Sequence, residues 1–102
     1  EHLVVLDDEV AALDQLDYFT VLKLGLEATP AEIRVAYHRE SRVYHPDRYA
    51  AVEDPVFRGQ VGRIYRRINE AYTVLRDDAR RKTYAAHVAG PDRASKLRFS
   101  ED

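Results

Sequence analysis

Residues 55–75 carry the strongest periodic pattern in this chain, with an apolar side chain at every third or fourth position. The apolar positions are Phe57, Val61, Ile64, Tyr65, Ile68, Ala71, Tyr72 and Leu75. This spacing places them on one face of an α-helix, and a face of this width has to be buried against another element. Asp54 followed by Pro55 is a typical helix start, because aspartate caps free N–H groups and proline fits the first helical position. The pattern therefore predicts a long helix over 55–75.

A second long helix is predicted over about 30–44. It begins with a capping box from Thr29 to Glu32, in which the two side chains satisfy free backbone N–H groups at the helix start. It ends before Pro46, whose ring disfavours helical geometry at the preceding residue. Its apolar positions are Ile33, Ala36, Tyr37 and Tyr44. Two long helices joined by a short loop pack antiparallel, so we expect an all-α helical hairpin.

Glu40 interrupts the apolar stripe of this second helix. A carboxylate buried at that position without a partner would be strongly destabilising. We expect Glu40 either to pair with an arginine of the long helix, such as Arg63 or Arg67, or to point outward through a local distortion.

A short helix at about 18–24 is predicted to precede the hairpin. Asp17 is its expected N-cap, and Gly25 is expected to end it. An extra N-terminal helix is possible at about 7–16, where Asp7 or Asp8 could serve as the cap.

Another short helix, at about 78–88, is predicted to follow the hairpin. Asp77 or Asp78 begins it, and Gly90-Pro91 closes it. The polar residues 92–102 are expected to form a loose tail.

The residue types of the chain exclude several kinds of chemistry. Cysteine is absent, which excludes disulfides, thiolate catalysis and cysteine-bound zinc. The four histidines show no metal-ligand spacing, and neither a glycine-rich nucleotide loop nor an activated serine motif is present. We therefore expect no enzymatic activity, no cofactor and no metal site.

The ends and the hydropathy of the chain bear on its context. With 102 residues, the chain is expected to form one domain. Methionine is absent even at position 1, so we interpret the chain as a fragment of a longer protein. Neither a membrane-spanning apolar run nor a signal-peptide pattern is present. We expect a cytoplasmic monomer that does not associate with membranes.

Charge is distributed unevenly along the chain. Residues 1–22 contain six acids and no Lys or Arg, whereas residues 56–84 contain eight bases and three acids. A basic region of this kind suits an acidic partner surface or nucleic acid. The alternative is a solvated face whose charges pair internally.

The best candidate for a partner-binding site is the segment Tyr44-His45-Pro46-Asp47-Arg48. The proline fixes a rigid turn at a helix end, the imidazole can donate and accept hydrogen bonds, and the carboxylate can take a bidentate arginine from another molecule. A plain helix stop with a side-chain-stabilised turn would explain the same residues.

The surrounding sequence resembles the J-domain of the DnaJ (heat-shock 40 kDa) co-chaperone family. Three blocks carry the likeness: DYFTVL at 17–22, EIRVAYHRESRVYHPDR at 32–48 and INEAYTVLRDDARRKTY at 68–84. Their order and spacing agree with the family over about 70 of the 102 residues. The resemblance implies a J-domain at 17–89, preceded by an extension or linker helix at 1–16 and followed by a C-terminal tail at 90–102.

The resemblance also implies a function. J-domains bind a DnaK-type 70 kDa heat-shock chaperone and stimulate its ATP hydrolysis, so the chemistry takes place in the partner. In this chain, Asp47 would accept from a partner arginine, His45 would orient the loop and Pro46 would fix its shape. The basic face that meets the chaperone would consist of Arg34, Tyr37, His38, Arg39, Arg42 and Arg48.

Three departures from the family pattern leave other functions open. Glu40 stands where an apolar residue is usual, His38 replaces a usual Lys or Arg, and Lys23 stands where glycine is common. A first alternative is a docking module of the same fold that does not stimulate ATPase activity. A less favoured alternative is nucleic-acid binding through the arginine-rich long helix, against which the overall net charge of −2 argues.

Overall fold

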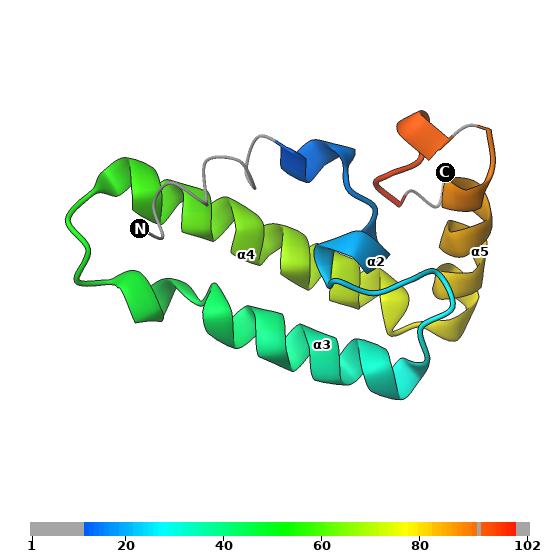
Figure 1. Ribbon diagram of the computed structural model, residues 1–102, viewed down its shortest axis with the longest axis horizontal. Helices are drawn as coiled ribbons and strands as arrows, with labels where there is room; N and C mark the ends of the chain where they lie inside the picture. Colours follow the sequence, from blue (N-terminus) through cyan, green and yellow to red (C-terminus); the bar gives the residue numbers. More distant parts are fainter. Residues whose placement is uncertain (1–11, 92, 100–102) are drawn as a thin grey trace.

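The computed structural model describes residues 12–91 and 93–99, and every regular element within them is helical. The α-helices are α2 (Tyr18–Val21), α3 (Pro30–Val43), α4 (Pro55–Leu75) and α5 (Asp78–Ala89), and the 3-10 helices are η1 (Leu13–Gln15), η2 (Pro46–Tyr49) and η3 (Arg93–Ser95). In Figure 1, α3 and α4 run side by side in opposite directions, α2 packs on α4, and α5 turns away from the end of α4. The predicted all-α hairpin is confirmed.

The two hairpin helices begin at the residues that the sequence predicts. The Thr29 hydroxyl accepts a hydrogen bond from the Glu32 backbone N–H at 3.1 Å, and the Glu32 carboxylate accepts one from the Thr29 N–H at 2.9 Å. The Asp54 carboxylate caps α4 by accepting from the N–H groups of Val56 and Phe57. These local bonds satisfy donors that the first turn of a helix leaves free, and they fix the ends of the hairpin.

One core lies where α2, α3, α4 and α5 meet. Its largest fully buried side chains are Tyr18, Phe19, Leu22, Ile33, Val61, Ile68, Leu75 and Tyr84. Four of these eight come from the apolar stripes of the hairpin, as their periodicity predicts, and three more come from residues 18–22. Burying them removes apolar surface from water, and this holds the short helices against the long ones.

The first short helix ends earlier than predicted, and not at Gly25. α2 stops at Val21, and Lys23 takes a left-handed conformation with φ 63°. The Leu24 N–H donates to the Phe19 carbonyl at 2.7 Å, and the Lys23 N–H donates to Thr20. This is a Schellman motif, whose left-handed position glycine usually fills. Lys23 takes that position at a steric cost of about 1–2 kcal/mol.

The possible helix at about 7–16 lies only partly within the described residues. Positions 7–11 lie outside them. Of the remainder, Leu13–Gln15 form a single 3-10 turn with Leu13 buried, and Leu16 is extended. A continuous α-helix through residue 16 is therefore wrong.

The expectation of a loose C-terminal tail is wrong for residues 93–99. Arg93 donates to the buried Asp17 carboxylate at 3.0 Å, and the same carboxylate caps α2 by accepting from the Thr20 N–H. Leu97 and Phe99 also pack against the core. The segment therefore returns to the start of the domain instead of leaving it.

Two buried tyrosines connect this segment to the core. Their rings, from Tyr18 and Tyr84, stack with centroids 4.5 Å apart. The Tyr84 hydroxyl accepts from the Tyr18 backbone N–H at 2.9 Å and donates to the Leu97 carbonyl at 2.6 Å, while the Tyr18 hydroxyl accepts from the Phe99 N–H at 3.0 Å. Burial is the main reason that the pKa of Tyr18 rises to about 12. Both hydroxyls therefore stay protonated at neutral pH.

Glu70 of α4 is the charged end of this network, and its substitution should change the acid sensitivity of the fold. Burial pushes its pKa up, but hydrogen bonds from Arg98 and Tyr18 outweigh burial, so the pKa lies below its usual range. A carboxyl whose pKa is lowered in the folded state stabilises the fold above its unfolded pKa, and this contribution is lost as the pH falls through the folded pKa.

We expect the difference in free energy of unfolding between the wild type and Glu70→Gln to shrink from about pH 6 to about pH 3. Urea denaturation across that range measures it, and an exposed Glu53→Gln control should show a constant, small difference. A difference for Glu70→Gln that does not change with pH would contradict the expectation.

Candidate functional site

The segment from His45 to Asp47 forms an exposed corner between the two long helices. His45 is extended, as expected before a proline, and Pro46 is the first residue of η2. The Asp47 side chain is 93% exposed, and Nδ1 of His45 lies 3.9 Å from its carboxylate. The exposure predicted for this loop is confirmed, and its carboxylate is available to another molecule.

His45 fixes the backbone of the corner. Its Nδ1 accepts a hydrogen bond from the Asp47 N–H at 3.2 Å, so the proton of the neutral ring is assigned to Nε2. The ring also lies against Tyr65 of α4, with centroids 5.1 Å apart. The imidazole thus holds the loop, and its Nε2 side is the part that can face a partner.

Tyr49 anchors the far end of η2. Its hydroxyl donates to the Val43 carbonyl at 2.9 Å, and its ring packs edge-on against Phe57 at 5.3 Å. The corner is therefore attached to both long helices, which limits the conformational freedom of the loop before it binds a partner.

Arg58 is a residue of this region that the sequence reasoning missed. It lies in the second turn of α4 and lines a pocket of about 280 Å³ together with Pro46, Asp47 and Tyr49. The antiparallel hairpin brings the start of α4 next to the end of α3, and this geometry is the signal that could have identified it. Arg58 adds a cation to the surroundings of the Asp47 carboxylate.

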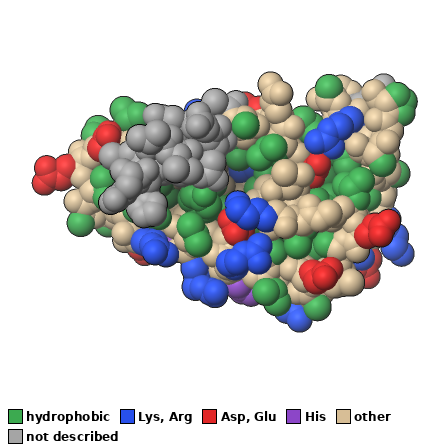
Figure 2. All heavy atoms as spheres, viewed as in Figure 1, with side chains coloured by type: hydrophobic (Ala, Val, Ile, Leu, Met, Phe, Trp, Pro, Cys, Tyr) green, Lys and Arg blue, Asp and Glu red, His purple; other side chains and the backbone are tan. Residues whose placement is uncertain are grey.

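Arg34, His38 and Arg42 form the exposed basic column of α3. They lie four residues apart, so they follow one another along one side of the helix over about 12 Å. Figure 2 shows Lys and Arg side chains gathered over α3, with a histidine between them. Arg48 is exposed on η2, beyond the end of this column. The predicted basic face is therefore open at these four positions.

Tyr37 is engaged between the long helices. Its ring stacks on Tyr72 of α4 with centroids 4.0 Å apart, and its hydroxyl donates to Oδ1 of Asn69 at 2.6 Å. Burial is the first cause that raises the pKa of this hydroxyl. Tyr37 thus joins α3 to α4, and only part of its ring faces outward.

Arg39 and Glu40 form an internal ion pair, which corrects the predicted partner of Glu40. The Glu40 side chain is 6% exposed and lies 3.0 Å from Nε of Arg39 and 3.4 Å from Nζ of Lys23. Neither Arg63 nor Arg67 is its partner among the described residues. The Arg39 guanidinium also donates to the Leu22 carbonyl at 3.1 Å. Unlike the column, Arg39 is tied to α2 and to its own helix.

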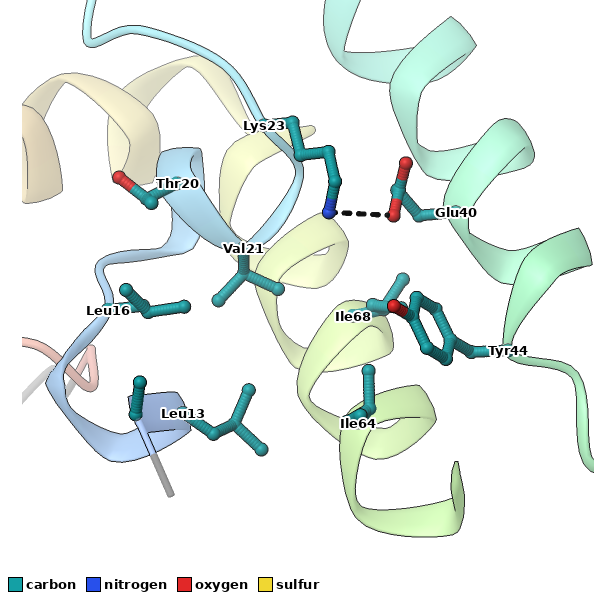
Figure 3. Close-up of a pocket in the computed structure, with 10 residues that line it drawn as sticks. Leu13, Leu16, Thr20, Val21, Lys23, Glu40, Tyr44, Ile64 and Ile68 are labelled. Carbon is teal, nitrogen blue, oxygen red and sulfur yellow. Dashed lines mark ion pairs between the residues drawn. The ribbon is translucent and has the colours of Figure 1, made fainter. Parts of the chain in front are cut away.

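The Lys23–Glu40 pair borders an apolar pocket of about 250 Å³. Figure 3 shows the two side chains pointing toward each other above the pocket. Its apolar lining consists of Ala12, Leu13, Leu16, Val21, Tyr44, Ile64 and Ile68. An apolar side chain in place of the carboxylate would therefore meet apolar neighbours.

Glu40→Leu is expected to raise the free energy of unfolding by about 1–2 kcal/mol, because replacing a buried ion pair by a packed apolar side chain is often stabilising. Lys23 and Arg39 are both about half exposed, so water can solvate them after the substitution. Urea denaturation measures the effect, and the slope of the unfolding free energy against urea concentration should stay unchanged. Glu40→Gln is the matched control, since it removes the charge but keeps the shape and should not stabilise the fold. A Glu40→Leu chain less stable than the wild type would contradict the expectation.

Within residues 12–91 and 93–99, no group of three or more His, Cys, Asp and Glu side chains is arranged to hold a metal ion. No helix in the same ranges combines the length and apolar character needed to cross a membrane.

Comparison with known proteins identifies the family to which this chain belongs. Residues 17–85 match a family model described as DnaJ domain. The chain is 36% identical over 72 residues to "DnaJ homolog subfamily C member 11" of Mus musculus, covering 71% of this chain and 12% of that protein. It is 36% identical over 85 residues to "Chaperone protein DnaJ" of Hydrogenobacter thermophilus, covering 83% and 22%, and 40% identical over 76 residues to "Chaperone protein DnaJ 1" of Aquifex aeolicus, covering 74% and 19%. The chain thus spans 12% to 22% of these relatives. No solved structure matches significantly.

Proposed function

Because the chain belongs to the DnaJ domain family over residues 17–85, we propose that it is a co-chaperone domain. It binds a DnaK-type 70 kDa heat-shock chaperone and stimulates the ATP hydrolysis of that partner. The chemistry takes place in the chaperone, and this domain supplies contacts only. The observation that carries the proposal is the exposed Asp47 carboxylate on a corner anchored to both long helices.

The role of this corner follows from its geometry. A guanidinium of the partner can bind the Asp47 carboxylate through two parallel hydrogen bonds, and such charge-assisted pairs are strong when water is excluded. The loop is already ordered by His45 and Tyr49, so little entropy is lost when it docks. Formation of this pair is the step that we propose to couple binding to hydrolysis.

The basic column of Arg34, His38 and Arg42 has a different role. Its side chains are exposed, so they attract an acidic surface at a distance and set the orientation of the encounter. Exposed charges of this kind act mainly on the association rate and on its salt dependence. Arg39 contributes less, because Glu40 and the Leu22 carbonyl already engage it.

The alternative is a docking module that binds the chaperone without stimulating it. The engagement of Arg39 with Glu40 supports this reading, since it removes one cation from the face. Binding and single-turnover ATP hydrolysis, measured with a DnaK-type chaperone from the same source, separate the two functions. Binding with faster hydrolysis supports the co-chaperone, binding without faster hydrolysis supports the docking module, and no binding contradicts both.

A further inference from the structure

Four arginines surround a second polar pocket, on the side of α4 away from α3. It has a volume of about 430 Å³, and its charged lining consists of Asp14, Arg63, Arg66, Arg67, Glu70 and Arg98. These residues come from η1, α4 and the C-terminal segment. None of them belongs to the basic column of α3 or to the His45–Asp47 corner, so this pocket is a separate feature of the surface.

The charges of the pocket do not balance. Four guanidiniums face two carboxylates, so two positive charges are in excess. Glu70 is already engaged by Arg98 at 2.5 Å and by Arg67 at 3.4 Å. Arg63 and Arg66 are exposed, and neither has a hydrogen bond or ion pair with any residue in the described ranges. The excess charge therefore belongs to Arg63 and Arg66.

Arg67 also lines the pocket, and one of its donors is unmet. Its side chain is 3% exposed; one terminal nitrogen donates to the Leu16 carbonyl at 3.2 Å, and the other faces Glu70. Its Nε is buried and has no partner in the described part of the chain. Buried donors are nearly always paired, so Arg67 is exceptional among the residues that line the pocket.

We propose that this pocket binds a compact phosphate dianion. Arg63 and Arg66 lie three residues apart on the same side of α4, so their planar groups can approach one anion together. Guanidinium forks match phosphate oxygens, and a phosphate monoester carries nearly two negative charges in a single group at neutral pH. That charge equals the excess on the pocket. This binding activity goes beyond the proposed co-chaperone function and does not depend on it.

A nucleic acid fits these residues less well than a compact anion. An extended strand needs a row of cations, but the lining of this pocket also contains two carboxylates, Asp14 and Glu70. The whole chain also carries a net charge of −2, which opposes non-specific attraction to a polyanion.

Titration of the ¹⁵N-labelled chain with inorganic phosphate and with phenyl phosphate, at about pH 7.5 and constant ionic strength, tests the proposal. We expect saturable shifts of the backbone amides around Arg63–Arg67 and of the arginine Nε–H signals of the pocket. Tighter binding of phenyl phosphate would identify a ligand-borne monoester as the source, and equal binding would identify free phosphate. Shifts that rise linearly with phosphate, or that spread over arginines throughout the chain, would overturn the proposal.

Two charge-matched double variants make the test specific. Arg63→Gln with Arg66→Gln should weaken phosphate binding at least about tenfold, since charge-assisted hydrogen bonds are lost. Arg76→Gln with Lys82→Gln removes the same charge outside the pocket and should change the affinity less than about twofold. The amide spectrum shows that both variants fold. Equal weakening by the two double variants, or an oligonucleotide that binds more tightly than phosphate and loses affinity equally in both, would overturn the compact site.

Discussion

Asp47→Asn is expected to reduce the stimulation of single-turnover ATP hydrolysis by about 30-fold or more. Removing one partner of a desolvated charge pair costs about 2–5 kcal/mol, and each 1.4 kcal/mol is a factor of ten. The substitution keeps the shape of the side chain and removes only its charge. Because this side chain is 93% exposed, the free energy of unfolding should not change.

Glu53→Gln is the matched control for this experiment. Glu53 is an exposed acid in the loop between η2 and α4, and no hydrogen bond or ion pair to another described residue involves it. Its loss changes the net charge of the chain by the same amount, so a general electrostatic effect would appear in both variants. Stimulation that survives Asp47→Asn, or that falls equally with Glu53→Gln, would contradict the role proposed for the corner.

The parts of the fold that could be predicted depend on local bonds. The capping box of Thr29 and Glu32 and the cap at Asp54 involve residues within three positions of each other, so their signals can be read from the sequence alone. The end of α2 could not be predicted in the same way. Lys23 occupies the left-handed position although Gly25 lies two residues further on, and its ammonium then lies close to Glu40. The sequence does not reveal that contact, because it joins two separate elements.

The candidate site shows the same division. A proline after a helix end places Asp47 on an exposed turn, and four-residue spacing places Arg34, His38 and Arg42 in one column. Which cations remain free was not predictable. Arg39 belongs to the same basic helix, yet it is tied to Glu40 and to the Leu22 carbonyl. Charge counting along a helix overestimates a binding face wherever a buried acid competes for the same cations.

The C-terminal segment is the part of the fold that the sequence predicts least well, because polar composition does not reveal the backbone bonds that a segment makes. Leu97 contributes a carbonyl to Tyr84, and Phe99 contributes an N–H to Tyr18. Both bonds join residues that are more than ten positions apart in the sequence. Both involve tyrosine hydroxyls, and the apolar pattern around a tyrosine predicts only that its ring is buried. The family match ends at residue 85, so this segment lies beyond the matched region although it completes the core.

Tyr84→Phe is expected to lower the free energy of unfolding by about 2–3 kcal/mol. The change removes the donor to the Leu97 carbonyl and leaves the buried N–H of Tyr18 without its acceptor, and an unsatisfied buried donor costs about 1–3 kcal/mol. The ring remains, so stacking on Tyr18 is preserved. For a domain of this size the midpoint of thermal unfolding should fall by about 8–20 °C.

Tyr65→Phe separates this loss from a general effect of removing a hydroxyl. Tyr65 is half-buried on α4, and its hydroxyl makes no hydrogen bond to another described residue, so we expect a change below about 0.5 kcal/mol. In a chain truncated after Gly90, the Leu97 carbonyl is absent, and Tyr84→Phe should then cost only the bond to the Tyr18 N–H. An equal cost in the full and truncated chains would show that the C-terminal segment does not use the Tyr84 hydroxyl in solution. A cost equal to that of Tyr65→Phe would show that neither bond contributes, and the two tyrosines would then act through their rings alone.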